Sequence, residues 1–142
     1  MNFKEIIFGS QDYQSAVKLR DDILRKPLNM QFEIANLAKE KHDFHLACFE
    51  EHTIIAVLFL TKIDENTIRM RQVAVNENWQ NRKVGTQLVK FAESFSKERG
   101  FSKMILHSRK IALKFYQRLS YNIIGNEFLE INIPHFKMEK HI

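Results

Sequence analysis

A basic cluster with a single glycine stands where a strand pattern gives way to a helix pattern. Gln80, Arg82, Lys83 and Gly85 follow a valine-rich run and precede a long amphipathic segment. The first turn of a helix leaves backbone N–H groups unpaired and carries partial positive charge, so it attracts anions. Arginine and lysine oppose the helix dipole there, where aspartate or glutamate is the usual choice. We therefore expect an external anion at this turn, with a phosphate group as the first candidate.

Net charge and motif content narrow the kind of anion. The chain of 142 residues has a formal net charge of +5, so it would attract a nucleic acid or a small ligand with several phosphates. Basic residues alternate with acids elsewhere, as in 18–26, and coincide with a helix start and a glycine only at 82–85. This distribution favours a localised anion site and disfavours a nucleic-acid partner. Walker, dinucleotide, zinc-protease and serine-hydrolase motifs are missing from the sequence, and we expect no metal.

Cysteine content and hydropathy bear on the cellular setting. Cys48 is the only cysteine, so no internal disulfide can form, which fits a reducing compartment. No apolar run reaches the length of a membrane span, and the N-terminus lacks a signal-peptide pattern. We expect a cytoplasmic protein with no membrane partner and one domain over residues 1–142. The sequence leaves a homodimer open.

Alternation and helical periodicity predict the elements that position the anion site. The expected strands are 3–8, 44–50, 53–63, 67–75, 103–108, 121–130 and 135–139. The expected helices run from Ser10 to Pro27 and over 32–41, 84–100 and 110–119. A helical crossover joins strands 67–75 and 103–108, which predicts a parallel pair in a largely antiparallel sheet. The order predicts an α/β fold with a mixed sheet.

Strand 67–75 contains an irregularity beside the predicted anion site. Its apolar residues occupy even positions at Ile68 and Met70 but odd positions at Val73 and Val75. Because strand side chains alternate strictly, this change of parity indicates either burial on both faces or a β-bulge near 71–72.

Three motifs in order resemble the GCN5-related N-acetyltransferase (GNAT) family. Residues 80–85 resemble the family's (Gln/Arg)-x-x-Gly-x-(Gly/Ala) loop, with Lys83 in place of the first glycine. Residues 112–121 look like its fourth-helix motif A-x-x-F-Y-x-x-x-G-(F/Y), with Ser120 at the glycine position. Residues 127–140 are similar to the ending of small bacterial ElaA-like members, where Asn132 replaces a glycine, and 19–30 also resemble that subgroup. The resemblance spans nearly the whole chain. It implies a sheet with helices on both faces, splayed between the fourth and fifth strands.

The resemblance also implies an activity, which is direct transfer of an acetyl group from acetyl-CoA to a primary amine. It implies that Tyr116 is the general acid that protonates the departing thiolate. The alternative is a core tyrosine whose hydroxyl bonds a backbone carbonyl. Beside the inferred bulge, the Val73 N–H is our candidate oxyanion donor. The residues expected to bind the cofactor are Val73, Ala74, Val75, Gln80, Asn81, Arg82, Lys83, Val84, Gly85, Thr86, Phe115 and Tyr116. A CoA-binding regulatory module without catalysis is the alternative function, and a nucleic-acid-binding protein is the less favoured one.

The general base is left undetermined by the sequence. An amine of the lysine type is charged at neutral pH, since its pKa is about 10.4, so a base or a water chain must take a proton from it. His107, Glu130 and His135 are the candidates. The acceptor itself is not fixed by any motif.

Overall fold

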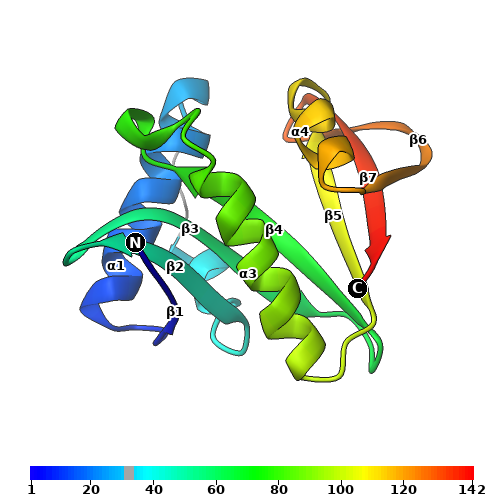
Figure 1. Cartoon of the computed structure of the whole chain (residues 1–142). Helices are drawn as coiled ribbons and strands as arrows, with labels where there is room; N and C mark the ends of the chain where they lie inside the picture. The colour runs from blue at the N-terminus through cyan, green and yellow to red at the C-terminus, as the bar shows by residue number, and fades with distance from the viewer. Residues whose placement is uncertain (31–33) are drawn as a thin grey trace.

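The described residues form a seven-stranded mixed sheet that the helices cover (Figure 1). The structure, a computed structural model, describes residues 1–30 and 34–142. The strand order is β1-β2-β3-β4-β5-β7-β6. The strands are β1 (Asn2–Ile6), β2 (Phe44–Glu50), β3 (Thr53–Lys62), β4 (Thr67–Val75), β5 (Lys103–Arg109), β6 (Asn122–Glu130) and β7 (Ile133–His141). The pairing of β4 with β5 is parallel and the other pairs are antiparallel, as the sequence predicts.

Helices lie on both faces of this sheet. They are α1 (Gln11–Arg20), α2 (Ile34–Ala38), α3 (Val84–Glu98) and α4 (Leu113–Arg118). Ser10 caps α1, because its hydroxyl accepts a hydrogen bond from the Tyr13 N–H. Among the described residues, no helix is long and apolar enough to cross a membrane.

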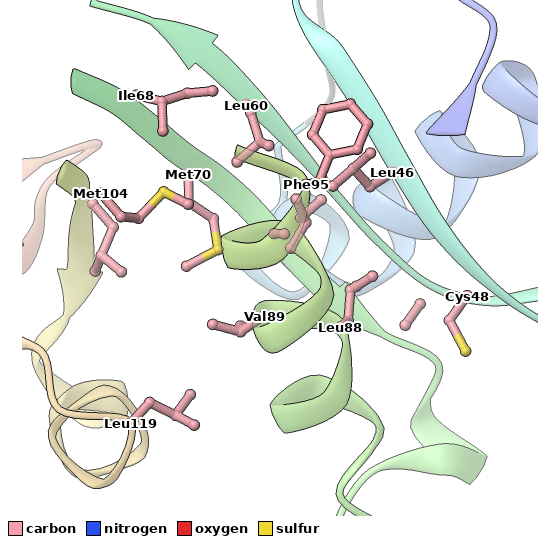
Figure 2. Close-up of a cluster of buried hydrophobic side chains, with 14 of the residues drawn as sticks. Leu46, Cys48, Leu60, Ile68, Met70, Leu88, Val89, Phe95, Met104 and Leu119 are labelled. Carbon is pink, nitrogen blue, oxygen red and sulfur yellow. The ribbon is translucent and has the colours of Figure 1, made fainter. Parts of the chain in front are cut away.

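Alternating strand residues build a separate core on each face. Even residues of β2, such as Leu46 and Cys48, pack with the apolar stripe of α3 (Figure 2). Odd residues of β2, such as Ala47 and Phe49, pack with α1 on the other face. β2 and β3 are therefore buried on both sides, which explains their continuous apolar runs.

The sheet opens between β4 and β5. Their pairing runs from Thr67↔Lys103 to Met70↔Leu106, although β4 continues to Val75 and β5 to Arg109. At the opening, β3 pairs Phe59 with Arg71 and Val57 with Ala74, so two residues of β4 face one of β3. This is a β-bulge, one of the two alternatives that the change of parity left open, and Gln72 within it has a φ of +52°. Figure 1 shows the two strands close together at one end and diverging toward α4.

Several element boundaries differ from the prediction. The first helix, expected to reach Pro27, ends at Arg20 and continues as a π-helical turn (Asp21–Arg25) and a 3₁₀ turn (Lys26–Leu28). The spacing of apolar residues in the sequence does not distinguish these turns from an α-helix, because that spacing is nearly the same in a π-helical turn. The first strand is shorter than 3–8 and the last is longer than 135–139. In the described part of the expected helix 32–41, α2 ends at Ala38 and residues 39–41 are not helical. Residues 32 and 33 of that prediction lie outside the described part of the chain.

Candidate active site

The diverging ends of β4 and β5 enclose a cleft of about 890 Å³. Its walls come from β4, the loop before α3, β5, α4 and the β6–β7 hairpin. Most residues predicted to bind the cofactor line it, namely Val73, Val75, Gln80, Asn81, Lys83, Val84, Gly85, Thr86, Phe115 and Tyr116. Two side chains lie elsewhere, because Ala74 packs beneath α1 and the exposed Arg82 stacks over the Trp79 ring at 5.1 Å.

Left-handed backbone shapes the loop that opens α3. Asn81 and Lys83 have φ values of +63° and +64°. Lys83 thus holds the conformation that a glycine would adopt without strain. It precedes Val84 at the helix start and gives no side-chain hydrogen bond to it. The first N–H groups of α3 therefore have neither an intrahelical acceptor nor a side-chain cap, as an anion site requires.

Packing ties this loop to the sheet. Gln80 Nε2 donates to the carbonyl oxygen of Val75 at 3.0 Å, which holds the loop against the end of β4. A Cβ on Gly85 would lie 3.4 Å from the Phe115 ring and 3.5 Å from Val75. A larger side chain at Gly85 would displace Phe115, so the glycine permits α3, α4 and β4 to meet at the cleft.

The bulge in β4 is anchored from the α1 face. Arg20, with 1% of its surface exposed, donates from Nε to Gln72 Oε1 at 2.9 Å. Its other nitrogens donate to both carboxylate oxygens of Glu40 at 2.8 and 2.6 Å, and the Tyr13 hydroxyl donates to Glu40 at 2.9 Å. The bulged segment is therefore fixed to a buried, hydrogen-bonded ion pair.

Tyr116 stands on the α4 wall of the cleft and is half-buried. Its ring makes edge contacts with Phe115 at 4.9 Å and Tyr121 at 5.9 Å between centroids. Tyr121 in turn donates from its hydroxyl to Glu93 on α3 at 2.7 Å. Burial raises the pKa of Tyr116, so its phenol stays protonated at neutral pH.

The three candidate bases meet at one wall of the cleft, where His107 of β5 lies beside Glu130 and His135 of the β6–β7 hairpin. His107 Nδ1 lies 3.0 Å from Glu130 Oε1, and His135 Nε2 lies 3.5 Å from Glu130 Oε2. Arg69 joins them, with Nη2 3.0 Å from His107 Nδ1 and 3.6 Å from Glu130 Oε1. The pairing of β5 with β7 and of β7 with β6 brings these side chains to the same edge.

Comparison with known proteins assigns this fold and cleft to a family. The sequence profile of the acetyltransferases known as GNAT matches residues 13–121. The chain belongs to the Acetyltransferase (GNAT) family. An uncharacterized protein of Bacillus subtilis (strain 168), YyaT, is 26% identical over 146 residues, which cover 100% of this chain and 97% of the relative.

Solved GNAT structures share the architecture. An aminoglycoside 6'-N-acetyltransferase complexed with coenzyme A superposes with a TM-score of 0.83 at 15% identity, covering 99% of this chain and 97% of that one. Escherichia coli ElaA superposes with a TM-score of 0.81 at 18% identity and 98% coverage of both chains. At these identities the likeness establishes the GNAT fold alone, and the predicted ElaA-like subgroup is not established.

Hydrogen bonds constrain the protonation of the two histidines in this GNAT cleft. His135 Nδ1 lies 2.7 Å from the carbonyl oxygen of Ile133, so Nδ1 carries a proton and donates. His107 Nδ1 either accepts from Arg69 or donates to Glu130, because one nitrogen cannot do both. In the second state, Nε2 of His107 is left as a proton acceptor.

Glu130 supplies the negative charge of this group. Burial raises the pKa of the Glu130 carboxyl, but its hydrogen bond with His107 and the nearby charges of His107, His135 and Arg69 outweigh burial. The pKa therefore lies below its ordinary value, and Glu130 is ionised at neutral pH.

The sequence analysis missed an arginine group in the cleft. Four arginines contribute to the described lining: Arg25, Arg69, Arg71 and Arg109. A signal was available in β4, where arginines alternate with the buried Ile68 and Met70. Charged side chains in the middle of a central strand are costly to bury without a role.

Proposed function

We propose that the protein transfers the acetyl group of acetyl-CoA directly to a primary amine within the cleft between β4 and β5. One observation carries the proposal. The lining of one cleft contains an uncapped helix start, a β-bulge, Tyr116 and a histidine–carboxylate group. We take residues 1–142 as one such domain, since both core clusters pack on the same sheet.

The donor end is formed by the loop before α3 and the end of β4. The N–H groups of Val84, Gly85 and Thr86 would bind the pyrophosphate, and the ammonium of Lys83 adds positive charge beside them. From Gln72 to Val75, the edge of β4 that faces β5 is unpaired, and it offers backbone groups to the pantetheine amides. Acetyl-CoA supplies an activated thioester, and the residues of the chain hold it in place.

Two groups act on the reacting bonds. As the amine nitrogen bonds to the carbonyl carbon, charge grows on the carbonyl oxygen, and the Val73 N–H donates to that oxygen. As the C–S bond breaks, Tyr116 gives its proton to the sulfur. The second proton that the acylated nitrogen loses passes to solvent, and solvent returns a proton to the tyrosine oxygen.

His107 is the base we propose for the ammonium proton. With Nδ1–H donated to Glu130, its Nε2 accepts the proton, and the ionised carboxylate stabilises the resulting imidazolium. His135 is less suited, because Nδ1 is engaged with the Ile133 carbonyl and Nε2 already faces Glu130.

The C-terminal hairpin supports a narrower placement within the family. Residues 127–140 resemble the ElaA-like ending, and Asn132 occupies its glycine position with a φ of +59°. We place the chain in that subgroup.

A panel of primary amines tests the function. Free CoA release is measured with acetyl-CoA and each amine, and mass spectrometry identifies the acetylated product. At least one amine should be acetylated. His107→Gln should lower the turnover number at neutral pH by roughly 10²-fold, the usual size for general base catalysis, and His135→Gln should lower it less. Acetyl-CoA binding with no acetylation of any amine would favour the regulatory alternative.

A further inference from the structure

The hydrogen-bond ladder between β3 and β4 fixes the direction of the backbone N–H groups beside the bulge. Asn76 donates from its N–H to the carbonyl oxygen of Ile55 at 2.8 Å. Two residues earlier, Ala74 of β4 pairs with Val57. N–H groups alternate in direction along an antiparallel strand, so the N–H of Ala74 points to β3 and that of Val73 points away from it. On that side β5 has separated from β4, and the Val73 N–H therefore faces the cleft.

Gln72 sets the orientation of this N–H group. The N–H lies in the planar peptide unit that joins Gln72 to Val73, so the unit turns with the backbone angles of Gln72. Gln72 has a φ of +52°, where a residue of an antiparallel strand ordinarily has about −140°. A residue with a Cβ is strained in this left-handed conformation, which glycine adopts freely. A contact that holds the glutamine side chain therefore also orients the Val73 N–H.

Arg20 provides that contact from α1. Its Nε donates to Gln72 Oε1 at 2.9 Å, and its other two nitrogens donate to the carboxylate of Glu40. The guanidinium also lies 4.7 Å from the ring centre of Phe59. Arg20 and Glu40 are both buried, so solvent does not compete for these bonds. A guanidinium group held by a carboxylate and a ring has little freedom, and Gln72 is thus bonded to a rigid donor.

The contact and the reacting groups lie on different sides of β4. The side chains of Val73 and Val75 pack against the core cluster beneath α3, whereas Gln72 Oε1 is bonded to α1 on the other face. The side-chain oxygen of Gln72 is occupied by Arg20. Its effect on the cleft therefore passes through the backbone that follows it.

We propose that Gln72 and Arg20 are positioning residues for the oxyanion donor, because their hydrogen bond holds Gln72 in the left-handed conformation and so directs the Val73 N–H at the acetyl carbonyl oxygen. This inference rests on the proposed function and assigns to it two residues that act through Val73. Without the contact, the peptide unit between Gln72 and Val73 can rotate. Such rotation weakens the stabilisation of charge that develops in the transition state more than it weakens binding of acetyl-CoA.

Two substitutions at Gln72 separate positioning from folding. Gln72→Met keeps nearly the same side-chain shape and removes the oxygen that accepts from Arg20. Gln72→Gly also removes the oxygen, but it relieves the left-handed strain, so it loses the contact without the conformational penalty. Each variant should lower kcat by roughly 10-fold to 100-fold and change KM for acetyl-CoA by less than about 3-fold, as expected for an interaction made in the transition state.

Matched controls exclude effects of composition and of strain relief elsewhere. Gln14→Met makes the same replacement at an exposed position of α1, outside the cleft lining. Glu51→Gly relieves a left-handed residue with a φ of +54° in the exposed turn between β2 and β3. Both controls should keep the wild-type kcat. A preserved rise in melting temperature with acetyl-CoA shows that a variant folds and binds its donor. Wild-type kcat in either folded Gln72 variant, or a loss confined to KM, would overturn the inference.

Nuclear magnetic resonance tests the inference without turnover, so its outcome is distinct from that of the proposed function. The protein is labelled with ¹⁵N in its valines, and the Val73 signal is assigned by its absence in Val73→Ile. Spectra are recorded with CoA and with acetyl-CoA, in the absence of any amine. In the wild type the Val73 N–H signal should move downfield when acetyl-CoA replaces CoA, because the N–H gains a carbonyl acceptor, and Gln72→Met should lose this displacement.

The two readouts decide separately. The expected displacement and its loss in Gln72→Met would support the inference even if no amine is acetylated. An equal displacement in Gln72→Met, or none in the wild type, would overturn the inference and leave the acetyltransferase standing wherever an amine is acetylated.

Discussion

Arg20 on α1 donates a hydrogen bond from Nε to the side-chain oxygen of Gln72, the left-handed residue of the β4 bulge, at 2.9 Å. The same guanidinium forms a bidentate pair with Glu40. A helix on one face of the sheet is thereby connected to the point where β4 leaves β5. The bulge that shapes the cleft depends on this buried contact.

Removing the guanidinium group of Arg20 should destabilise the folded protein. Arg20→Leu leaves the Glu40 carboxylate buried without its cation, and we expect the free energy of unfolding to fall by about 3–5 kcal/mol. Urea denaturation measures this change. The double variant Arg20→Leu/Glu40→Leu should recover much of the loss, because no buried charge remains. Lys18→Ala, in an exposed pair with Asp22, is the control and should change stability little. A loss below about 1 kcal/mol for Arg20→Leu would contradict this role of the pair.

A substitution at the C-terminal end of α4 should stabilise the protein. Ser120 has a φ of +74°, and its N–H bonds the Gln117 carbonyl while the Tyr121 N–H bonds the Tyr116 carbonyl. This is a Schellman motif with serine where glycine is preferred. Ser120→Gly should raise the free energy of unfolding by about 1 kcal/mol by relieving the left-handed conformation.

Ser120→Ala serves as the comparison, because alanine keeps the Cβ and should give no gain. Ser120 is exposed and lies outside the cleft lining, so turnover should not change in either variant. A Ser120→Gly protein no more stable than Ser120→Ala would show that the left-handed residue carries no strain.

Two substitutions distinguish the roles of Lys83. Lys83→Ala keeps a Cβ at a φ of +64° and removes only the ammonium. If the ammonium binds a phosphate, acetyl-CoA affinity should fall and become less dependent on salt. Lys83→Gly also relieves the backbone, so it should bind acetyl-CoA more tightly than Lys83→Ala. Titrations at two ionic strengths measure both effects, and wild-type affinity in both variants would leave Lys83 without a role in binding.

Tyr116→Phe isolates the proposed proton donor. Phenylalanine keeps the ring contacts with Phe115 and Tyr121 and deletes only the hydroxyl. We expect turnover to fall by roughly 10²-fold, the usual range for a general acid, with little change in acetyl-CoA affinity. Steady-state kinetics and melting temperature should be measured on the same preparation. Wild-type turnover, or a joint loss of stability and activity, would make Tyr116 a packing residue.

Local rules predicted much of the fold and many of the residues that line the cleft. The parity change between Met70 and Val73 indicated either burial on both faces or a bulge, and the structure has the bulge. The helical crossover anticipated the parallel pairing of β4 and β5. Lys83 and Ser120, which stand at glycine positions of the family motifs, both have the left-handed backbone that only glycine adopts freely.

Local sequence patterns do not predict contacts between residues that are far apart in the chain. Nothing in the spacing of Arg20, Glu40 and Gln72 shows that they meet, since their contact depends on how α1 packs on the sheet. The meeting of His107 with Glu130 likewise depends on the register of β5, β7 and β6. Sequence could name these candidates but could not rank them, because ranking needs the hydrogen-bond partners of each nitrogen.

Calorimetric titration of acetyl-CoA into the wild-type protein and into Gly85→Val tests the central claim most directly. The wild type should give saturable heat with a dissociation constant in the micromolar range and a raised melting temperature. Gly85→Val should fold but lose this binding, because the larger side chain meets Phe115 and Val75 at the start of α3. No heat and no thermal shift in the wild type at saturating acetyl-CoA would contradict the proposed acetyltransferase function, and unchanged binding in Gly85→Val would show that the phosphates bind elsewhere.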